Sequence, residues 1–327
     1  MLDKLQKKKL QLDQHRPLSK ALVKNLAHWF DVELTYASNA IEGNTLSRRE
    51  TAIVFDKGIT IGGKSLNEHL EVTSHKQALI FMRGLVDQKT ITQNELLDLN
   101  RFILRTIQPD DAGRYRNVMV RISGSTTVLP NAKKVPTLME DFFVWLKNSN
   151  DHPVEKAALA HYKLVTIHPF IDGNGRTARL LMNLLLLQAG YPIAIISPKH
   201  RLIYLSALER AQTGGSLESF MQLLYKAVDK SLDIYLKAIS GEVVLEPVTH
   251  IPKNLLKIGE VAKKANETVP TIRFWTKEGL IQPANHTESG YFLYNEKVFP
   301  VIDKIREMQR KRLSIKEIKE LIKKENS

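Results

Sequence analysis

Apolar residues recur every three to four positions along most of the first 240 residues, and this period is what most constrains the fold. It is regular in 18–30, 75–86 and 91–107, and again in 135–148 and 155–167. Such spacing gathers apolar side chains on one face of a helix, and that face has to pack against other helices. We therefore expect a mainly α-helical chain.

The helical period continues beyond residue 167, and it is interrupted once, at 118–130. Gly190 and Pro192 end one further helix, and two more helices are expected over 198–212 and 216–240. Residues 118–130 break the pattern, because they are rich in β-branched side chains, contain Ser-Gly-Ser and end at a proline. The sequence predicts a short β-hairpin there.

Two polar pairs mark the starts of helices. Thr92 is followed three residues later by Glu95, and Ser314 is followed three residues later by Glu317. In this spacing the hydroxyl and the carboxylate each bond a free backbone N–H of the first helical turn. We expect a capped helix after each pair.

The composition excludes several classes of protein. Of the 327 residues, 43% are hydrophobic and 25% charged, as is typical of globular chains rather than disordered or collagen-like ones. No cysteine is present, which excludes a disulfide scaffold, a thiolate zinc site and a cysteine nucleophile, and which fits a reducing cytoplasm. The longest apolar stretch, 180–196, is interrupted by Asn183, Gln188 and Pro192, so we expect no membrane span. The lysine-rich start MLDKLQKKKL predicts no export signal.

Positive charge is denser toward the C-terminus. The chain carries a net charge of +13, and 251–327 contains 16 lysines and arginines against 10 aspartates and glutamates. That segment therefore holds +6 of the total. Such an excess favours a polyanionic partner such as nucleic acid, whereas a solvated, lysine-rich helical surface is the simpler alternative.

The segment 168–179, HPFIDGNGRTAR, carries the most chemical information. Its paired glycines allow successive backbone N–H groups to point at one anion, and the start of the following helix adds partial positive charge. Arg176 and Arg179 are three residues apart and project from one helix face as a fork for phosphate oxygens. Asp172 is a hard oxygen ligand of the kind that Mg²⁺ uses beside phosphates. His168 supplies an imidazole, whose unperturbed pKa near neutrality suits it to take a proton from a hydroxyl.

Each of these features alone is ordinary loop or surface chemistry. Their coincidence within twelve residues predicts a site for phosphoryl or nucleotidyl transfer. The segment also matches the signature of Fic-domain proteins, HPFx(D/E)GNGRxxR, at every defined position. The resemblance extends over most of 1–240 and includes GRYRNVMVRISGS at 113–125, VPTLMEDFFVWL at 135–146 and YLSALERAQTGG at 204–215.

The Fic resemblance implies a helical fold and an activity. Fic proteins mostly transfer AMP from ATP to a Ser, Thr or Tyr hydroxyl of a protein and release pyrophosphate. The resemblance therefore implies that ATP is the substrate, that Mg²⁺ is the cofactor, and that the acceptor is a protein. Whether this chain is itself an acceptor stays open.

The resemblance also assigns roles to the matching residues. His168 would deprotonate the target hydroxyl, and Asp172 would hold Mg²⁺. Arg176 would bind the β-phosphate, and Arg179 would reach the γ-phosphate. The residues that would cradle the α- and β-phosphates are Gly173, Asn174 and Gly175.

Two further regions acquire roles in the same way. Tyr204 and Gln212 fall where the family builds its adenine pocket. The expected hairpin at 118–130 would be the flap, which holds the backbone of the target protein by strand addition. Its docking residues would be Val118, Val120, Ile122 and Gly124.

A third region, Ser38–Gly43, predicts self-inhibition. Ser38 and Glu42 are four residues apart on one face at the end of a helical stretch, and Gly43 is a typical helix-ending residue. A carboxylate is slightly unfavourable at that end of a helix. The segment resembles the inhibitory motif (S/T)xxxE(G/N) of Fic proteins, which implies that Glu42 pairs with Arg179 and displaces the γ-phosphate. In relatives that remove AMP the same glutamate can position water, so addition and removal both stay open.

The last seventy or so residues resemble a MerR-type winged helix-turn-helix. In that family the helix that contains TIRFW enters the major groove, and the GYxxY wing contacts phosphates. The DNA contacts implied here are Arg273 and the cluster Arg310, Lys311 and Arg312. Phe292 replaces the arginine that the family has in its wing, and the sequence stops at Ser327, short of the long dimerising helix of many such regulators. A module that docks on protein is therefore the alternative, and a homodimer stays open.

Together these features predict a cytoplasmic protein adenylyltransferase that is self-inhibited through Glu42 and carries a DNA-binding-like module. The alternatives are a transcriptional regulator whose Fic unit senses nucleotide, a Fic enzyme acting mainly in de-AMPylation, and an enzyme with another diphosphate-linked donor. His168 argues against a pure sensor, because nucleotide binding needs no base. The expected divisions are an N-terminal helical region with the inhibitory motif at 1–90, a Fic catalytic core at 91–240, a linker at 241–253 and the MerR-like module at 254–327.

Overall fold

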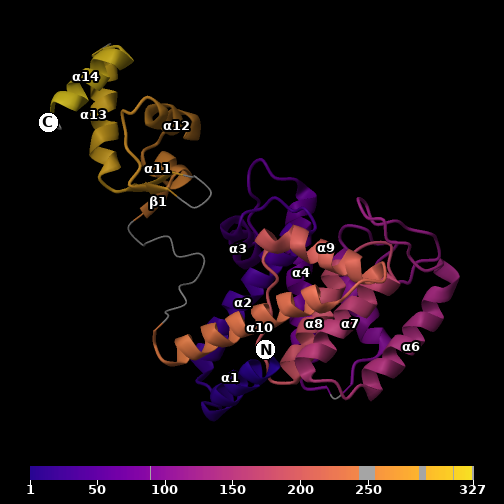
Figure 1. Ribbon diagram of the computed structural model, residues 1–327. Helices are drawn as coiled ribbons and strands as arrows, with labels where there is room; N and C mark the ends of the chain where they lie inside the picture. Colours follow the sequence, from indigo (N-terminus) through magenta and orange to yellow (C-terminus); the bar gives the residue numbers. More distant parts are fainter. Residues whose placement is uncertain (89, 243–254, 287–291, 312, 326–327) are drawn as a thin grey trace. The chain divides into compact units, whose positions relative to one another are not determined.

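The computed structural model describes residues 1–88, 90–242, 255–286, 292–311 and 313–325 (Figure 1). The chain divides into two compact units, Met1–Val248 and Thr249–Ser327, and each is treated separately below. The expected linker, 241–253, lies outside the described residues except for Gly241 and Glu242. In the described part of the chain, no helix combines the length and apolar character that crossing a bilayer needs.

The first unit is helical, as the apolar period predicts. Two short 3₁₀ turns, Ala132–Lys134 and Pro198–His200, precede α6 and α9. Its α-helices are α1 (Leu2–Gln14), α2 (Lys20–Ile41), α3 (Arg48–Lys57), α4 (Leu66–Gly84), α5 (Gln93–Leu104), α6 (Val135–Asn148), α7 (Pro153–Ile167), α8 (Asn174–Gln188), α9 (Arg201–Gln212) and α10 (Glu218–Ile239).

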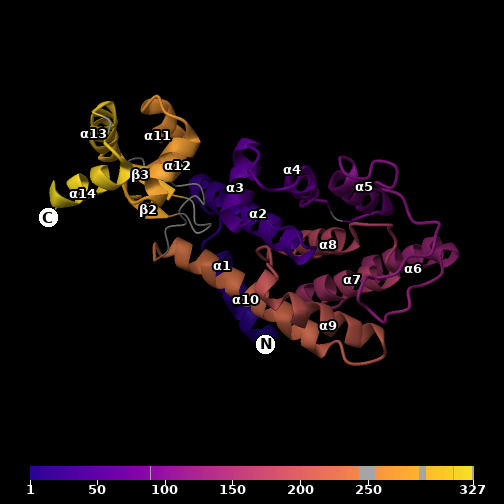
Figure 2. The ribbon, with the colours of Figure 1, turned by 90° about the horizontal axis from the view of Figure 1, so that it is seen from above.

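Helix α8 lies at the centre of this unit. It contacts α2, α4, α5 and α7, and Figure 2 shows α4 and α5 on one side of it and α7 on the other. Its side chains from Ala178 to Leu184 are all buried, which is typical of a helix enclosed on every side. The surrounding helices therefore fix the N-terminus of α8, where the loop 168–173 leads into the helix.

The expected helix caps are present. Thr92 and Glu95 form a reciprocal capping box at the start of α5. Ser314 Oγ and its backbone N–H both donate to Glu317, and Ser314 Oγ also accepts from the Glu317 N–H. Two further boxes, at Ser47 and Ser65, begin α3 and α4.

The hairpin predicted at 118–130 is wrong. This segment contains a turn in which the Ser125 N–H donates to the Ile122 carbonyl, but no β-strand. The Arg116 guanidinium accounts for the difference, because it donates to the carbonyls of Val118 (3.1 Å) and Pro130 (2.7 Å) and so lies between the two arms. The arms are joined by a side chain instead of a backbone ladder, and the flap is a loop (Figure 1).

The second unit contains a small antiparallel sheet with strand order β1-β3-β2. Leu256 pairs with Tyr294, and Asn285 pairs with Leu293. Strand β3 overlaps the GYxxY wing of the MerR resemblance, whose Gly290 and Tyr291 lie outside the described residues. The elements are β1 (Leu255–Lys257), α11 (Ile258–Lys264), α12 (Val269–Lys277), β2 (Asn285–His286), β3 (Phe292–Asn295), α13 (Val298–Arg310) and α14 (Ile315–Glu325).

Apolar side chains from these helices and strands form a core within the second unit. Ile272 and Trp275 of α12 are buried against Tyr294 of β3 and against Ile302 and Ile305 of α13. The Tyr294 hydroxyl lies 2.7 Å from the Thr276 hydroxyl, so the polar end of this buried ring has a hydrogen-bond partner. The second unit thus has an apolar core of its own.

Candidate active site

The loop between α7 and α8 is held by side chains of α8 and α5. Asn174 accepts a hydrogen bond from the Phe170 N–H and donates one to the Phe170 carbonyl, both at 2.9 Å. Asn100 of α5 donates to the Asp172 carbonyl at 3.1 Å. Gly173 has φ +76°, and a Cβ there would lie 3.1 Å from the Asn100 amide. The loop therefore needs glycine at this position, for conformation as well as for space.

A cavity of about 180 Å³ opens at this loop. It is lined by the end of α2, the loop and first turn of α8, the flap, and one face of α9. The predicted site residues on its wall are His168, Gly175, Arg179, Glu42, Tyr204, Gln212, Ile122 and Gly124. Val118 and Val120 of the flap do not line it, and neither do Asp172 and Arg176.

Glu42 and Arg179 form the ion pair that the inhibitory motif predicts. Glu42 Oε1 lies 2.6 Å from Arg179 Nη2, and the two residues are 137 positions apart. The Arg179 side chain is 2% exposed, whereas Glu42 keeps 37% of its side-chain surface exposed. Burial is the largest single influence on the pKa of Glu42 and raises it. The charge and hydrogen bond of Arg179, together with the charges of Arg176 and Arg201, lower it by more, so the pKa falls below its ordinary value. Glu42 is therefore an anion at neutral pH.

Each nitrogen of the Arg179 guanidinium also has a partner other than Glu42. Its Nε donates to Ser38 Oγ and its Nη2 to the Ser38 carbonyl, both at 3.0 Å, while Nη1 donates to the Tyr204 hydroxyl at 3.3 Å. The Tyr204 hydroxyl in turn lies 2.9 Å from His161 Nε2. The end of α2 and Tyr204 thus hold the guanidinium in place independently of Glu42.

The carboxylate of Glu42 lies against the first turn of α8. A Cβ built on Gly175 would be 2.4 Å from Glu42 Oε1, so Glu42 lies directly over a position that lacks a side chain. The start of a helix attracts anions through its free N–H groups and its dipole. Glu42 occupies this anion-binding position with a charge of the chain's own.

Arg176 has different partners from Arg179. It is 4% exposed, and it donates to Glu71 Oε1 at 3.1 Å and to Asp172 Oδ2 at 3.2 Å. Glu71 on α4 also accepts a hydrogen bond at 2.8 Å from Asn44, the residue that follows the inhibitory motif. Glu71 was not predicted, and no local pattern in the sequence marks it. Arg176 thus pairs with Glu71 and Asp172, whereas Arg179 pairs with Glu42.

Asp172 is suited to hold a magnesium ion beside phosphates. Its Oδ1 accepts from the Gly173 N–H at 2.6 Å, and its side chain is 46% exposed. No group of three or more His, Asp or Glu side chains with metal-binding geometry occurs among the described residues. Mg²⁺ commonly binds through one carboxylate, with phosphate oxygens and water completing its shell, and a single half-exposed carboxylate fits that mode.

His168 ends α7 in a left-handed conformation with φ +52°. Its Nδ1 lies 3.3 Å from the Val165 carbonyl, which can only accept, so Nδ1 carries the hydrogen and Nε2 keeps its lone pair. Burial lowers the pKa of His168, and the charge of Arg116 lowers it further, while the Val165 bond and the charges of Glu42 and Asp172 raise it. Since the net direction is downward, the imidazole is neutral at pH 7.

The flap is held at its tip by a glutamate that sequence reasoning missed. Glu209 Oε1 on α9 accepts from the Thr126 N–H at 2.7 Å, and from the hydroxyls of Ser125 and Thr126 at 2.9 Å. Gln212, one turn further along α9, accepts from the Thr127 hydroxyl at 3.2 Å. The tip of the flap is thus hydrogen-bonded to α9, and these bonds place Ile122 and Gly124 at the wall of the cavity.

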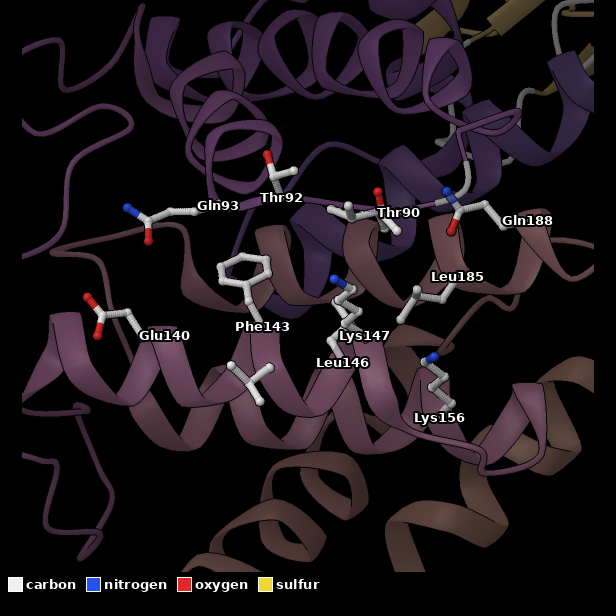
Figure 3. Close-up of a pocket in the computed structure, with 12 residues that line it drawn as sticks. Thr90, Thr92, Gln93, Glu140, Phe143, Leu146, Lys147, Lys156, Leu185 and Gln188 are labelled. Atoms are coloured by element: carbon white, nitrogen blue, oxygen red, sulfur yellow. The ribbon is translucent and has the colours of Figure 1, made fainter.

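A larger cavity, of about 530 Å³, lies elsewhere in the first unit (Figure 3). Figure 3 shows Phe143 and Lys147 of α6 pointing toward the segment that contains Thr90 and Thr92. None of the residues predicted for catalysis or nucleotide binding lines it. The candidate active site is therefore identified by its chemistry and not by the size of its cavity.

In the second unit, Arg273 and Phe274 of α12 are exposed. Arg310 at the end of α13 is also exposed, and the exposed Lys311 pairs with Glu307 at 2.6 Å. Arg312, the last member of the predicted cluster, lies outside the described residues. The predicted DNA contacts that are described are thus all accessible to solvent.

Comparison with known proteins agrees with the geometry of both units. A model of the Fic/DOC family matches residues 90–186, and a model of MerR HTH family regulatory proteins matches 256–325. The "Protein adenylyltransferase Fic" of Drosophila virilis is 40% identical over 257 residues, which cover 73% of this chain and 52% of that protein. That of Aedes aegypti is 35% identical over 263 residues, which cover 79% and 50%.

Solved structures extend the comparison. Fic-1 from C. elegans is 33% identical with a TM-score of 0.66, and the match covers 73% of each chain. A Fic domain containing signaling protein from Bacteroides thetaiotaomicron is 28% identical with a TM-score of 0.67, over 74% of this chain and 98% of that one. The chain belongs to the Fic family. It spans about half the length of the curated relatives that it matches.

Proposed function

We propose that this chain is a protein adenylyltransferase that transfers AMP from ATP to a Ser, Thr or Tyr hydroxyl of a protein, and that Glu42 inhibits it. The observation that carries the proposal is the Glu42–Arg179 ion pair, which lies at the N-terminus of α8 in the same cavity as His168. An anion-binding position occupied by an internal carboxylate beside a neutral histidine fits a self-inhibited site for nucleotide transfer.

The proposed reaction uses His168 as its base. Nε2 takes the proton of the acceptor hydroxyl, the hydroxyl oxygen forms a bond to the α-phosphorus of ATP, and the bond from that phosphorus to the bridging oxygen of pyrophosphate breaks. Pyrophosphate leaves with the electron pair of that bond. The neutral state of His168 at pH 7 supports this role, because a protonated imidazole cannot accept the proton.

The nucleotide would bind along the start of α8. Gly173, Asn174 and Gly175 would hold the α- and β-phosphates, Arg176 the β-phosphate and Arg179 the γ-phosphate. Asp172 would hold Mg²⁺, which when bound neutralises phosphate charge. Tyr204 and Gln212, on the wall of the same cavity, would border the adenine.

The target protein would dock on the flap. Val118, Val120, Ile122 and Gly124 lie along it, and Val118 and Val128 expose 50% and 92% of their surface. Exposed apolar side chains beside a cavity that holds a base are suited to contact a protein chain. A second copy of this chain is one acceptor that the proposal allows.

Glu42 also supports a second activity, the hydrolytic removal of AMP. Its carboxylate is anionic, 37% exposed and on the same cavity wall as His168, so it could hold a water against a bound phosphodiester. The two activities respond oppositely to its loss, because Glu42→Gly would raise AMP transfer but abolish AMP removal.

For the second unit we propose binding to duplex DNA through Arg273 and the basic end of α13. The exposed Arg273 on α12, in a segment that matches the MerR family model, supports this role. Docking on a protein is the alternative. The units proposed from the sequence, 1–90, 91–240 and 254–327, would then combine an inhibitory region, a catalytic core and a DNA-binding module.

The experiment that tests the enzymatic proposal uses ATP labelled at either the α- or the γ-phosphate. Wild type, Glu42→Gly and His168→Ala are each incubated with Mg²⁺ and either label, and protein-bound radioactivity is measured. AMP transfer predicts label from α-labelled ATP only, most strongly in Glu42→Gly. Label from γ-labelled ATP would indicate a kinase instead, and no label in any variant would favour the nucleotide-sensing regulator.

A further inference from the structure

Arg116 is a buried cation held by backbone carbonyls. It is 2% exposed, and no carboxylate in the described part of the chain pairs with it. Its guanidinium donates only to backbone carbonyls: Nε to His168 at 2.7 Å, Nη1 to Val118 at 3.1 Å and Nη2 to Pro130 at 2.7 Å. A buried charge is costly unless it is hydrogen-bonded, and here each of the three guanidinium nitrogens donates to one carbonyl.

These carbonyls belong to the two segments on which the proposed reaction depends. His168 and Pro169 begin the catalytic loop, whereas Val118 and Pro130 bound the flap. The main-chain N–H of Arg116 also donates to the Pro169 carbonyl at 2.9 Å. Arg116 thus donates to the carbonyls of both His168 and Pro169, and it also donates to both arms of the flap.

We propose that Arg116 is the positioning residue that sets the general base against the flap, so that the hydroxyl of a flap-bound target meets His168 Nε2. The proposal rests on the adenylyltransferase function proposed above. Arg116 is not on the wall of the nucleotide cavity, so it acts through His168 and the flap and not on ATP.

The charge of Arg116 has a second effect on the base. The charged groups that act on His168 are Arg116, Glu42 from the end of α2 and Asp172 from the catalytic loop. Arg116 opposes protonation of the imidazole, and the two carboxylates favour it. Loss of the Arg116 charge should therefore raise the pKa of His168, and a lysine at the same position should retain the lower value.

The two effects can be separated by two substitutions in the Glu42→Gly background. Arg116→Lys keeps the charge but cannot donate to three carbonyls in the fork geometry. Arg116→Gln removes the charge as well. Arg83→Gln is the matched control, because Arg83 pairs with Asp31 on α2 and lies on no wall of the cavity. Thermal melting of each variant checks the fold.

The first readout is AMP transfer from α-labelled ATP to the chain itself, as a function of ATP concentration and pH. We expect kcat to fall about tenfold or more in both Arg116 variants while KM for ATP stays unchanged, since misplacement by about 1 Å can cost a hundredfold. The acid limb of the pH profile should move to higher pH in Arg116→Gln and stay in place in Arg116→Lys.

The second readout needs no activity. The imidazole signal of His168, assigned by its loss in His168→Ala, is titrated by NMR, and its midpoint should rise in Arg116→Gln only. If the Glu42→Gly protein transfers no AMP, the proposed function fails, while the titration still tests the coupling of Arg116 to His168. Arg116 variants that match Arg83→Gln in kcat and in titration would overturn the proposal. If Arg116→Gln does not fold, the test rests on Arg116→Lys: a lowered kcat supports the proposal, and a kcat equal to that of Arg83→Gln overturns it.

Discussion

Replacing Glu42 by glycine should relieve the inhibition of AMP transfer, and the Glu42–Arg179 ion pair sets the expected size of the gain. Opposite charges about 4 Å apart at the edge of a protein interact by about 4 kcal/mol at an effective dielectric constant near 20. Because 37% of the Glu42 side chain is exposed, solvent screening reduces this to about 2 kcal/mol. That energy corresponds to about a thirtyfold preference for the inhibited arrangement.

The substitution should leave the rest of the site in place. Ser38 and Tyr204 still hold Arg179, and position 42 caps the C-terminus of α2, where glycine is tolerated. We therefore expect Glu42→Gly to raise the rate of AMP transfer about 10- to 30-fold.

The assay is incorporation of label from α-labelled ATP at saturating ATP and Mg²⁺. Glu33→Gln is the control, because it removes a carboxylate from the same helix at a position that faces Arg48 and not the cavity. Equal rates in wild type and Glu42→Gly would refute the inhibitory role of Glu42, and a matching gain in Glu33→Gln would refute the attribution to Arg179.

Three further outcomes follow from the site and the second unit. His168→Ala should lower AMP transfer by about 10²- to 10⁴-fold and leave ATP affinity, measured by calorimetry, nearly intact, because the base acts on the acceptor hydroxyl. Burial lowers the pKa of His168, and the base works only when it is unprotonated. In a pH–rate profile, AMP transfer by Glu42→Gly should therefore persist below the ordinary titration range of histidine and be lost only at more acidic pH. Arg273→Glu should weaken duplex binding and reduce the magnitude of the slope of log K against log salt by about 1, whereas binding that ignores both salt and this reversal would favour a protein partner.

Much of the fold could be predicted because its signals are local. Apolar spacing predicts the helices, and the capping pairs at Thr92 and Ser314 lie within four residues of chain. The segment 168–179 is likewise continuous, so the residues at the start of α8 could be named from the sequence. Ser38 and Glu42 could be named only because a short inhibitory motif marks them.

The rest depends on contacts between distant parts of the chain. Three hydrogen bonds join residues that are far apart in the sequence: Arg176 to Glu71 (105 positions), Thr126 to Glu209 (83 positions) and Arg116 to His168 (52 positions). The flap shows the same limit, since its β-branched residues favour strands, whereas in the structure the Arg116 side chain joins the two arms at the carbonyls of Val118 and Pro130. The strands β1 and β2, with three and two residues, are too short to produce an alternating pattern.

The most direct test of self-inhibited AMP transfer is the intact mass of the protein after incubation with ATP and Mg²⁺. Wild type, Glu42→Gly and the double variant Glu42→Gly/His168→Ala are compared side by side. The account predicts a covalent AMP adduct that forms readily in Glu42→Gly, slowly in wild type and not in the double variant. An adduct with the mass of a phosphate, or an AMP adduct of equal yield in the double variant, would contradict it.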